Sequence, residues 1–187
     1  MVEKRAGKNP IELRPVEEKE LAQIHKYHNG ECREELSDFL DSELLWAPMT
    51  LEQMKNKIAE MTKRERTVLS ALYAQKAEFV GLAFFSAGWD TWSPHIHVII
   101  WPKHRQKGYG RAAAQKLLDN CFGNTIAHSV GAGVSDWCEP GIHLAKSLGF
   151  SEVGKMRRTG VREGKFSDSI MFNILRSEYL GKRRKAR

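Results

Sequence analysis

One stretch, from His95 to Phe122, constrains the fold of this 187-residue chain more than any other. Its first part, His95 to Trp101, consists of β-branched, aromatic and imidazole residues that suit a pleated sheet, and Pro102 then removes the next backbone donor. From Tyr109 onward, small and apolar residues recur at steps of three and four, which predicts a helix with one face on a sheet. Gly123 is expected to end that helix. The stretch therefore predicts a strand, a loop and a helix in direct succession.

The loop between this strand and helix combines glycines with positive charge. Gly108 and Gly110 stand where the chain must turn tightly, and three basic residues, Arg105, Lys107 and Arg111, surround them. The first N–H groups of a helix have no partner within it and its dipole favours negative charge, so such a loop suits a phosphate or diphosphate. A solvated turn explains the loop equally well when it is taken alone. Neither the nucleotide P-loop pattern nor the dinucleotide pattern fits it.

Length and composition favour one domain. A chain of 187 residues with 41% hydrophobic residues can bury one real core but is short for two domains. Its three cysteines, Cys32, Cys121 and Cys138, have no metal-binding or redox spacing. No stretch approaches the roughly 20 apolar residues that a membrane helix needs. We therefore expect a cytoplasmic protein with reduced thiols and no metal.

The formal net charge of +7 is confined to the two ends of the chain. Residues 1–9 carry an excess of two positive charges and residues 182–187 an excess of five, so the rest is neutral. We expect a flexible N-terminus over 1–9, a domain over 10–180 and a solvated, disordered basic tail over 181–187. The alternative is that the tail gives a weak attraction to RNA or ribosomes.

Hydrophobic periodicity predicts the remaining elements. The helices are expected at 17–28, 32–46, 50–63 and 140–148, and the strands at 11–15, 67–74, 79–86, 125–134, 151–158 and 167–175. Gly160 to Lys165 is expected to form the polar loop of the final hairpin. His25 and His28 lie at helical spacing, which favours a pair on the helix surface over a shared metal ion.

The basic loop resembles a known signature. Arg105, Gly108 and Gly110 match the pattern [QR]-x-x-G-x-[GA] of the GNAT superfamily of N-acetyltransferases. Gly149-Phe150 after a short helix is a second match. The resemblance implies a GNAT fold of the α/β (α+β) class, with a mixed, mostly antiparallel sheet of about seven strands and helices on both faces.

The C-terminal part resembles one branch of this superfamily. Asp168 in the last strand and the pair Glu178-Tyr179 after it are similar to the ending of the RimJ/RimL N-terminal protein acetyltransferases. This resemblance implies transfer of an acetyl group from acetyl-CoA, as co-substrate, to a primary amine. The acceptor is either a protein N-terminus or a small-molecule amine, and it attacks the thioester directly in a ternary complex.

The resemblance also implies the positions that bind acetyl-CoA. The backbone of the strand is expected to pair with the pantetheine, and its first amide is a candidate donor to the oxyanion. The loop amides are expected to hold the diphosphate. The strand residues are Val98, Ile99 and Ile100, and the loop residues are Arg105, Gln106, Lys107, Gly108, Tyr109, Gly110 and Arg111.

The catalytic base is less certain from the pattern. The tyrosine that usually protonates the leaving thiolate is absent, because Ala145 occupies its slot and Cys138 that of the usual asparagine. His95 and His97 lie on one face of the strand that leads to the loop, and His97 is nearer the expected carbonyl, so both are candidate bases. A packed core histidine is an equally good interpretation, because the register turns the pair away from the acceptor side.

Two other functions stay open at this point. A non-catalytic acyl-CoA sensor would explain the missing tyrosine and asparagine, and an RNA- or ribosome-associated factor would explain the basic tail. Three tryptophans, Trp89, Trp92 and Trp137, are candidates for lining the acceptor site, although burial in the core is the commoner role. The expected assembly is a monomer or a homodimer.

Overall fold

The computed structural model describes residues 11–33, 35, 36, 48–64, 67–87, 90 and 92–185. Its strands follow the order β1-β2-β3-β4-β5-β7-β6 in one seven-stranded sheet. β4 and β5 are parallel, whereas β1 with β2, β5 with β7 and β6 with β7 are antiparallel. The mixed, mostly antiparallel sheet predicted from the sequence is therefore confirmed.

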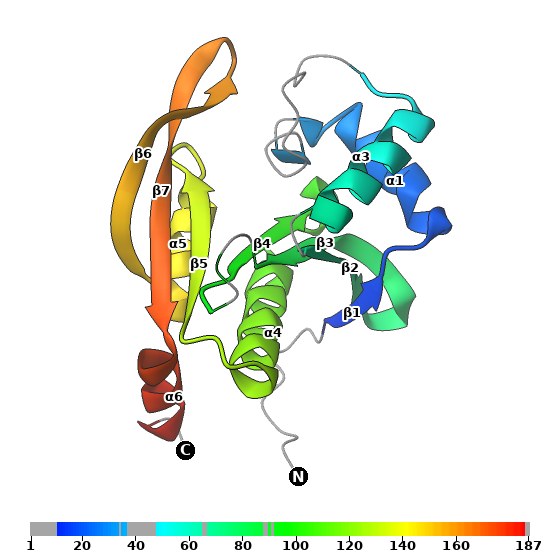
Figure 1. The fold of residues 1–187 in the computed structure, drawn as a ribbon. Coiled ribbons are helices and arrows are strands. Elements are labelled where there is room, and N and C mark those ends of the chain that lie inside the picture. Colours follow the sequence, from blue (N-terminus) through cyan, green and yellow to red (C-terminus); the bar gives the residue numbers. More distant parts are fainter. Residues whose placement is uncertain are drawn as a thin grey trace. The chain divides into compact units, whose positions relative to one another are not determined.

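The described elements appear along the chain in the order of Figure 1. The strands are β1 (Glu12–Pro15), β2 (Thr67–Ala74), β3 (Glu78–Ser86), β4 (His95–Ile100), β5 (Ser129–Ser135), β6 (Ser151–Arg162) and β7 (Lys165–Leu175). The helices are α1 (Glu18–His28), α3 (Leu51–Arg64), α4 (Tyr109–Asn124), α5 (Glu139–Leu148) and α6 (Arg176–Lys185), with short 3-10 turns η1 (Gln75–Ala77) and η2 (Pro102–His104). Much of the helix predicted over 32–46 lies outside the described residues.

Two compact units share the chain. The first consists of Met1–Phe85 and His97–Lys116, and the second of Ser86–Ile96 and Leu117–Arg187. β4 and α4 each begin in one unit and end in the other, so the units are not successive domains. The single domain expected over 10–180 stays a prediction.

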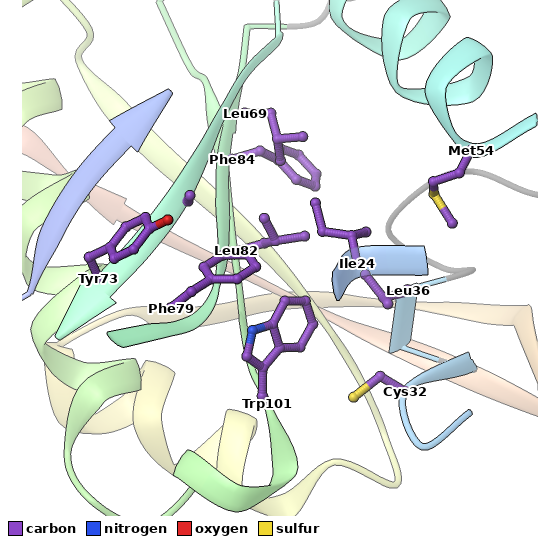
Figure 2. Packing of buried hydrophobic residues seen from close by; sticks show 11 residues of the cluster. Ile24, Cys32, Leu36, Met54, Leu69, Tyr73, Phe79, Leu82, Phe84 and Trp101 are labelled. Carbon is purple, nitrogen blue, oxygen red and sulfur yellow. The ribbon is translucent and has the colours of Figure 1, made fainter. Parts of the chain in front are cut away.

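The first unit is built around a cluster of aromatic and aliphatic side chains. Trp101 is wholly buried directly after β4, where it stacks on Tyr27 of α1 with the ring centroids 4.3 Å apart. It also meets the ring of Phe79 edge-on at 5.5 Å. Figure 2 shows Ile24 and Leu82 pointing toward the same space. The cluster holds the end of β4 in place, and the basic loop follows this end directly.

Side-chain caps start the two N-terminal helices as the sequence predicts. Thr50 accepts from the backbone N–H of Gln53 at 3.2 Å, and Gln53 accepts from that of Thr50 at 2.8 Å, which confirms the capping box of α3. α1 has an equivalent box between Glu17 and Glu20. The prediction of a surface histidine pair is wrong for His28, whose side chain is fully buried beside Asn29.

The second unit corrects two predicted boundaries. α4 runs through Gly123 to Asn124, so the prediction that Gly123 ends the helix is wrong. β5 begins at Ser129, four residues later than predicted, because Thr125 folds back and its hydroxyl donates to the Cys121 carbonyl at 2.7 Å. Arg176 fills the space after the helix: its guanidinium donates to the carbonyls of Phe122, Thr125 and Ala127. These bonds satisfy carbonyls that a helix end leaves open.

The β6–β7 hairpin is longer and tighter than the sequence predicts. The polar loop expected over Gly160 to Lys165 is wrong, because only Glu163 and Gly164 form the turn, both with positive φ (51° and 73°). Such two-residue turns match the twist of antiparallel strands. β5 pairs with β7 only as far as Ser169, so the hairpin continues beyond β5 (Figure 1).

The C-terminal residues also differ from expectation. α6 includes the backbone of 181–185, so the prediction of a disordered tail is wrong for these five residues. A helix with several lysines and arginines in its last turn is favoured by its own dipole. None of the helices in the described part of the chain is long and apolar enough to cross a membrane.

Candidate active site

The predicted strand, loop and helix are confirmed as β4, the segment 101–108 and α4. Within this segment Gln106 and Gly108 have positive φ values of 59° and 82°. A non-glycine residue rarely adopts this conformation, and alternation between right- and left-handed residues turns successive amides toward one side. The local backbone thus has the form of an anion-binding nest.

The start of α4 adds further donors to this nest. The first helical hydrogen bond runs from the amide of Ala112 to the carbonyl of Gly108 at 3.1 Å. The amides of Tyr109 and Gly110 therefore come before the first bond of a 16-residue helix. Lys107 and Arg111 have exposed side chains on the same short segment. Backbone donors, helix dipole and positive charge all favour an anion here.

Arg105 differs from the other loop residues. Its Nε donates to the carbonyl of Ile100 at 3.0 Å, and its guanidinium forms an ion pair with Glu35 at 2.8 Å. The sequence analysis expected this side chain to add charge for a diphosphate. Its side chain instead joins the loop to the end of β4 and to Glu35, so its part in any phosphate contact is left to its backbone.

β4 lies unusually close to β3 at the position of the predicted pantetheine strand. A side chain at Gly81 of β3 would collide with the carbonyl of Ile99, so only glycine fits there. The amide of Trp101 donates to the carbonyl of Val80 at 2.9 Å. Val98, Ile99 and Ile100 themselves are half-buried. The close approach of β3 fixes the backbone that these residues present.

His95 belongs to the second unit, where its ring lies against Gly131 of β5. β4 and β5 pair in parallel at His95 and Gly131, and a Cβ added to Gly131 would meet the imidazole at 2.8 Å. Burial lowers the pKa of His95 below its ordinary value, so the ring is neutral near pH 7. A neutral imidazole is the form that can accept a proton.

His97 belongs to the first unit and has a different neighbour. Its ring stacks on Phe84 of β3, with the centroids 4.2 Å apart and the planes 17° from parallel. Both histidines are half-buried, which is compatible with a base and with a packed histidine. The structure therefore leaves both sequence interpretations standing.

The tryptophans predicted to line the acceptor site have separate surroundings. Trp89 lies outside the described residues. Trp92 is 49% exposed, and its carbonyl accepts from the amide of His128 at 2.9 Å. Trp137 follows β5, and the guanidinium of Arg162 lies 4.0 Å from its ring centroid. The structure does not group the described members into one lining.

Three residues of this region could not be found from the loop motif. Gly81 and Gly131 are glycines inside predicted strands, and that pattern by itself signals a close approach of neighbouring groups. Glu35 had no such signal, since 70 positions separate it from Arg105. Among the described residues, no group of three or more His, Cys, Asp or Glu side chains could hold a metal ion.

Comparison with known proteins supplies the family. Residues 11–151, more than half of the chain, match the family described as "Acetyltransferase (GNAT) domain". The chain is 26% identical over 173 residues to the spermidine N(1)-acetyltransferase of Vibrio cholerae, covering 92% of this chain and 96% of the relative. It is 24% identical over 176 residues to the corresponding enzyme of Escherichia coli, with 91% and 88% covered.

A solved structure gives the same fold. The spermidine N-acetyltransferase of Vibrio cholerae in complex with CoA and spermine superposes with a TM-score of 0.77 at 22% identity, over 91% of this chain and 98% of the other. At that identity the likeness speaks for the fold. A dodecameric structure of the same enzyme has a TM-score of 0.72.

The chain belongs to the GNAT acetyltransferase family, which its loop at Arg105, Gly108 and Gly110 had indicated. It is an N-acetyltransferase, and acetyl-CoA is the co-substrate of this family. The predicted fold class, enzyme class and co-substrate are thus confirmed. The relatives named above are spermidine acetyltransferases, which the RimJ/RimL resemblance had not indicated.

Proposed function

We propose that this N-acetyltransferase transfers the acetyl group of acetyl-CoA to a primary amine of a small polyamine. One observation carries the coenzyme half of the proposal: left-handed Gln106 and Gly108 stand directly before the N-terminus of α4. The acceptor half rests on the relatives, whose names specify spermidine and whose similarity extends over about nine tenths of this chain.

In this proposal the coenzyme is held mainly by backbone groups. The amides from Gln106 to Gly110 face the diphosphate, and Lys107 and Arg111 add positive charge. The backbone of Val98, Ile99 and Ile100 pairs with the pantetheine arm, and the N–H of Val98 donates to the developing oxyanion. These roles need no particular side chain at the glycines, only their conformational freedom.

The acceptor must lose a proton to attack the thioester. His97 is the proposed general base and His95 the alternative. The lowered pKa of His95, which burial causes, keeps its imidazole neutral and able to accept a proton at neutral pH. The chain has no tyrosine in the slot of the usual proton donor, since Ala145 is buried there in α5, so water is the proposed donor to the thiolate.

The sequence contains an acidic segment suited to a polycationic acceptor. Residues 31–43 include six acidic residues and one arginine, in a chain whose net charge is positive. Of the six, Glu35 is engaged with Arg105 and the others are available to attract ammonium groups. A protein N-terminus carries a single ammonium group and would gain less from this segment. Membership of the RimJ/RimL branch stays a prediction, as does any affinity of the basic C-terminus for RNA.

One experiment tests both halves of the proposal. Gly108→Val and Gly164→Val replace glycines with similar positive φ (82° and 73°), so both substitutions strain the backbone equally. Only Gly108→Val is expected to abolish acetyl-CoA binding in calorimetry, because Gly164 lies in the β6–β7 turn. Unchanged affinity in Gly108→Val would contradict the coenzyme site.

The acceptor is identified by thiol release from acetyl-CoA with the wild-type protein. Spermidine and spermine are expected to give a higher kcat/KM than butylamine or a peptide with a free N-terminus, because each added ammonium group meets the acidic segment. A preference for the peptide would instead support the RimJ/RimL prediction. Binding of acetyl-CoA without thiol release for any amine would support the sensor hypothesis.

A further inference from the structure

Arg105 reaches three different segments of the first unit. Its Nε donates to the Ile100 carbonyl at the end of β4, and its terminal nitrogen lies 2.8 Å from Glu35 and 3.9 Å from the sulfur of Cys32. The guanidinium therefore points back from the diphosphate loop toward a helical turn that lies some 70 residues earlier. The loop is tied to this turn through one side chain.

The turn that carries Glu35 is itself fixed in the core. The amide of Leu36 donates to the carbonyl of Cys32 at 2.9 Å, and that of Cys32 donates to Tyr27 at 3.0 Å. Cys32 and Leu36 are wholly buried in the cluster that contains Trp101 (Figure 2). Burial raises the pKa of the Cys32 thiol to about 12, so it stays neutral beside the guanidinium.

Both members of the ion pair are thus placed by one core. Glu35 directly precedes buried Leu36, and Arg105 follows buried Trp101 by four residues. The side chains are only partly exposed, 26% for Glu35 and 45% for Arg105. A surface ion pair usually contributes little because both side chains must be ordered, and here the core has already limited that cost.

We propose that Glu35 is a positioning residue for the diphosphate loop. This inference rests on the proposed coenzyme site. By holding the Arg105 guanidinium against the Ile100 carbonyl, Glu35 fixes the path of the chain between β4 and the left-handed residues Gln106 and Gly108. The direction of the loop amides then depends on a residue that contacts no part of the coenzyme.

The proposal makes a prediction whose sign separates it from its rivals. If Glu35 positions the loop, its loss weakens diphosphate binding. If Glu35 merely neutralises Arg105, its loss frees a cation for the phosphates and strengthens binding. If the pair is an ordinary surface contact, its loss changes nothing measurable.

The test compares Glu35→Gln with Glu18→Gln. Glu18 forms an ion pair of similar length, 2.7 Å to Lys55, between α1 and α3, so its removal is a matched control. Steady-state kinetics with acetyl-CoA and with S-acetylpantetheine, which lacks the diphosphate, separate the loop from the pantetheine strand. We expect the KM for acetyl-CoA to rise about 10-fold in Glu35→Gln, with kcat and the KM for S-acetylpantetheine unchanged.

Two further variants keep the result interpretable. Glu35→Asp keeps the charge on a shorter side chain and should recover part of the affinity. Arg105→Lys should cost affinity by itself, and adding Glu35→Gln to it should cost little more, because both act through one contact. Calorimetry of CoA binding and melting temperatures on the same variants exclude a general loss of folding.

The outcomes of the two proposals are distinguishable. Failure of the wild-type protein to bind CoA would contradict the proposed function. Wild-type binding with an unchanged or tighter affinity in Glu35→Gln would overturn the positioning role alone. Equal losses for acetyl-CoA and S-acetylpantetheine would also overturn it, since the effect would then not concern the diphosphate.

Discussion

Two regions of the molecule use aromatic side chains in opposite ways. In the first unit Trp101 is fully buried between Tyr27 and Phe79, directly before the coenzyme loop. In the β6–β7 hairpin of the second unit Phe166 is 68% exposed, with the Arg158 guanidinium 5.5 Å from its ring centroid. The first region is held together by burial of apolar surface, whereas the hairpin is held by its backbone ladder and polar contacts.

The polar contacts of the hairpin are local to its two strands. Asp168 of β7 accepts from the amide of Arg158 at 2.8 Å and forms an ion pair with Lys155 at 2.8 Å. The hydroxyl of Thr159 donates to that of Ser169 at 2.8 Å. Exposed contacts of this kind contribute little individually, so changes in the hairpin should cost far less than changes in the core.

The largest expected effect is that of Trp101→Ala. Removal of a fully buried indole should lower the free energy of unfolding by about 3 to 5 kcal/mol, because it opens a cavity between α1 and β3. Phe166→Ala, the matched change in the hairpin, should lower it by no more than about 0.5 kcal/mol. Urea titrations of both variants measure the difference. Similar losses for the two would show that the hairpin aromatic is buried in solution.

Much of the first region could be predicted from the sequence because its signals are local. The steps of three and four after Tyr109 predicted α4, and the capping pair Thr50 and Gln53 predicted the start of α3. The spacing of Arg105, Gly108 and Gly110 indicated the family before any comparison. Each of these patterns depends on contacts within four or five residues.

The errors came from contacts over longer distances and from turns that several residue types allow. Thr125 looked like the start of a strand, but its hydroxyl returns to the Cys121 carbonyl and the strand begins later. Glu163 has a positive φ that its type does not announce, so the hairpin turn was predicted too long. The pairing of Arg105 with Glu35 depends on the tertiary fold alone, which no periodicity reports.

A substitution in β5 tests how far the second unit controls a candidate catalytic group. Gly131→Ala places a Cβ within 2.8 Å of the His95 ring, so the imidazole must move. We expect a loss of about 1 to 3 kcal/mol in the free energy of unfolding. Gly133→Ala, two residues along the same strand, meets only the Met171 sulfur at 3.7 Å and should be neutral or slightly stabilising.

The activity of the same two variants bears on the choice of base. If His97 is the base, Gly131→Ala keeps its kcat and the rise of kcat/KM with pH through about 6 to 8. If His95 is the base, Gly131→Ala loses rate about as strongly as His95→Ala, while Gly133→Ala does not. A full loss in His97→Ala with an intact Gly131→Ala would assign the role to His97.

The smallest expected effect concerns His104, which is buried at the start of the loop. Neither ring nitrogen has a hydrogen-bond partner, and the nearest carboxylate, that of Glu78, lies 3.6 Å from Nε2. Burial lowers the pKa of His104, as Lys103 and Lys107 also do, while Glu78 raises it. Since the folded pKa is below the ordinary 6.5, the unfolded chain binds the proton more readily.

The sign of the pH dependence follows from this difference. The stability of the folded protein is complete above about pH 6.5 and is lost as the pH falls through the lowered pKa of folded His104. His104→Leu removes this titration and an unsatisfied polar group, so at pH 8 it should change the free energy of unfolding by less than about 1 kcal/mol. Its advantage over the wild-type protein should grow between pH 6.5 and 5. His143→Leu, which alters an exposed histidine of α5, is the control, and parallel pH profiles for all three proteins would show that His104 does not titrate differently on folding.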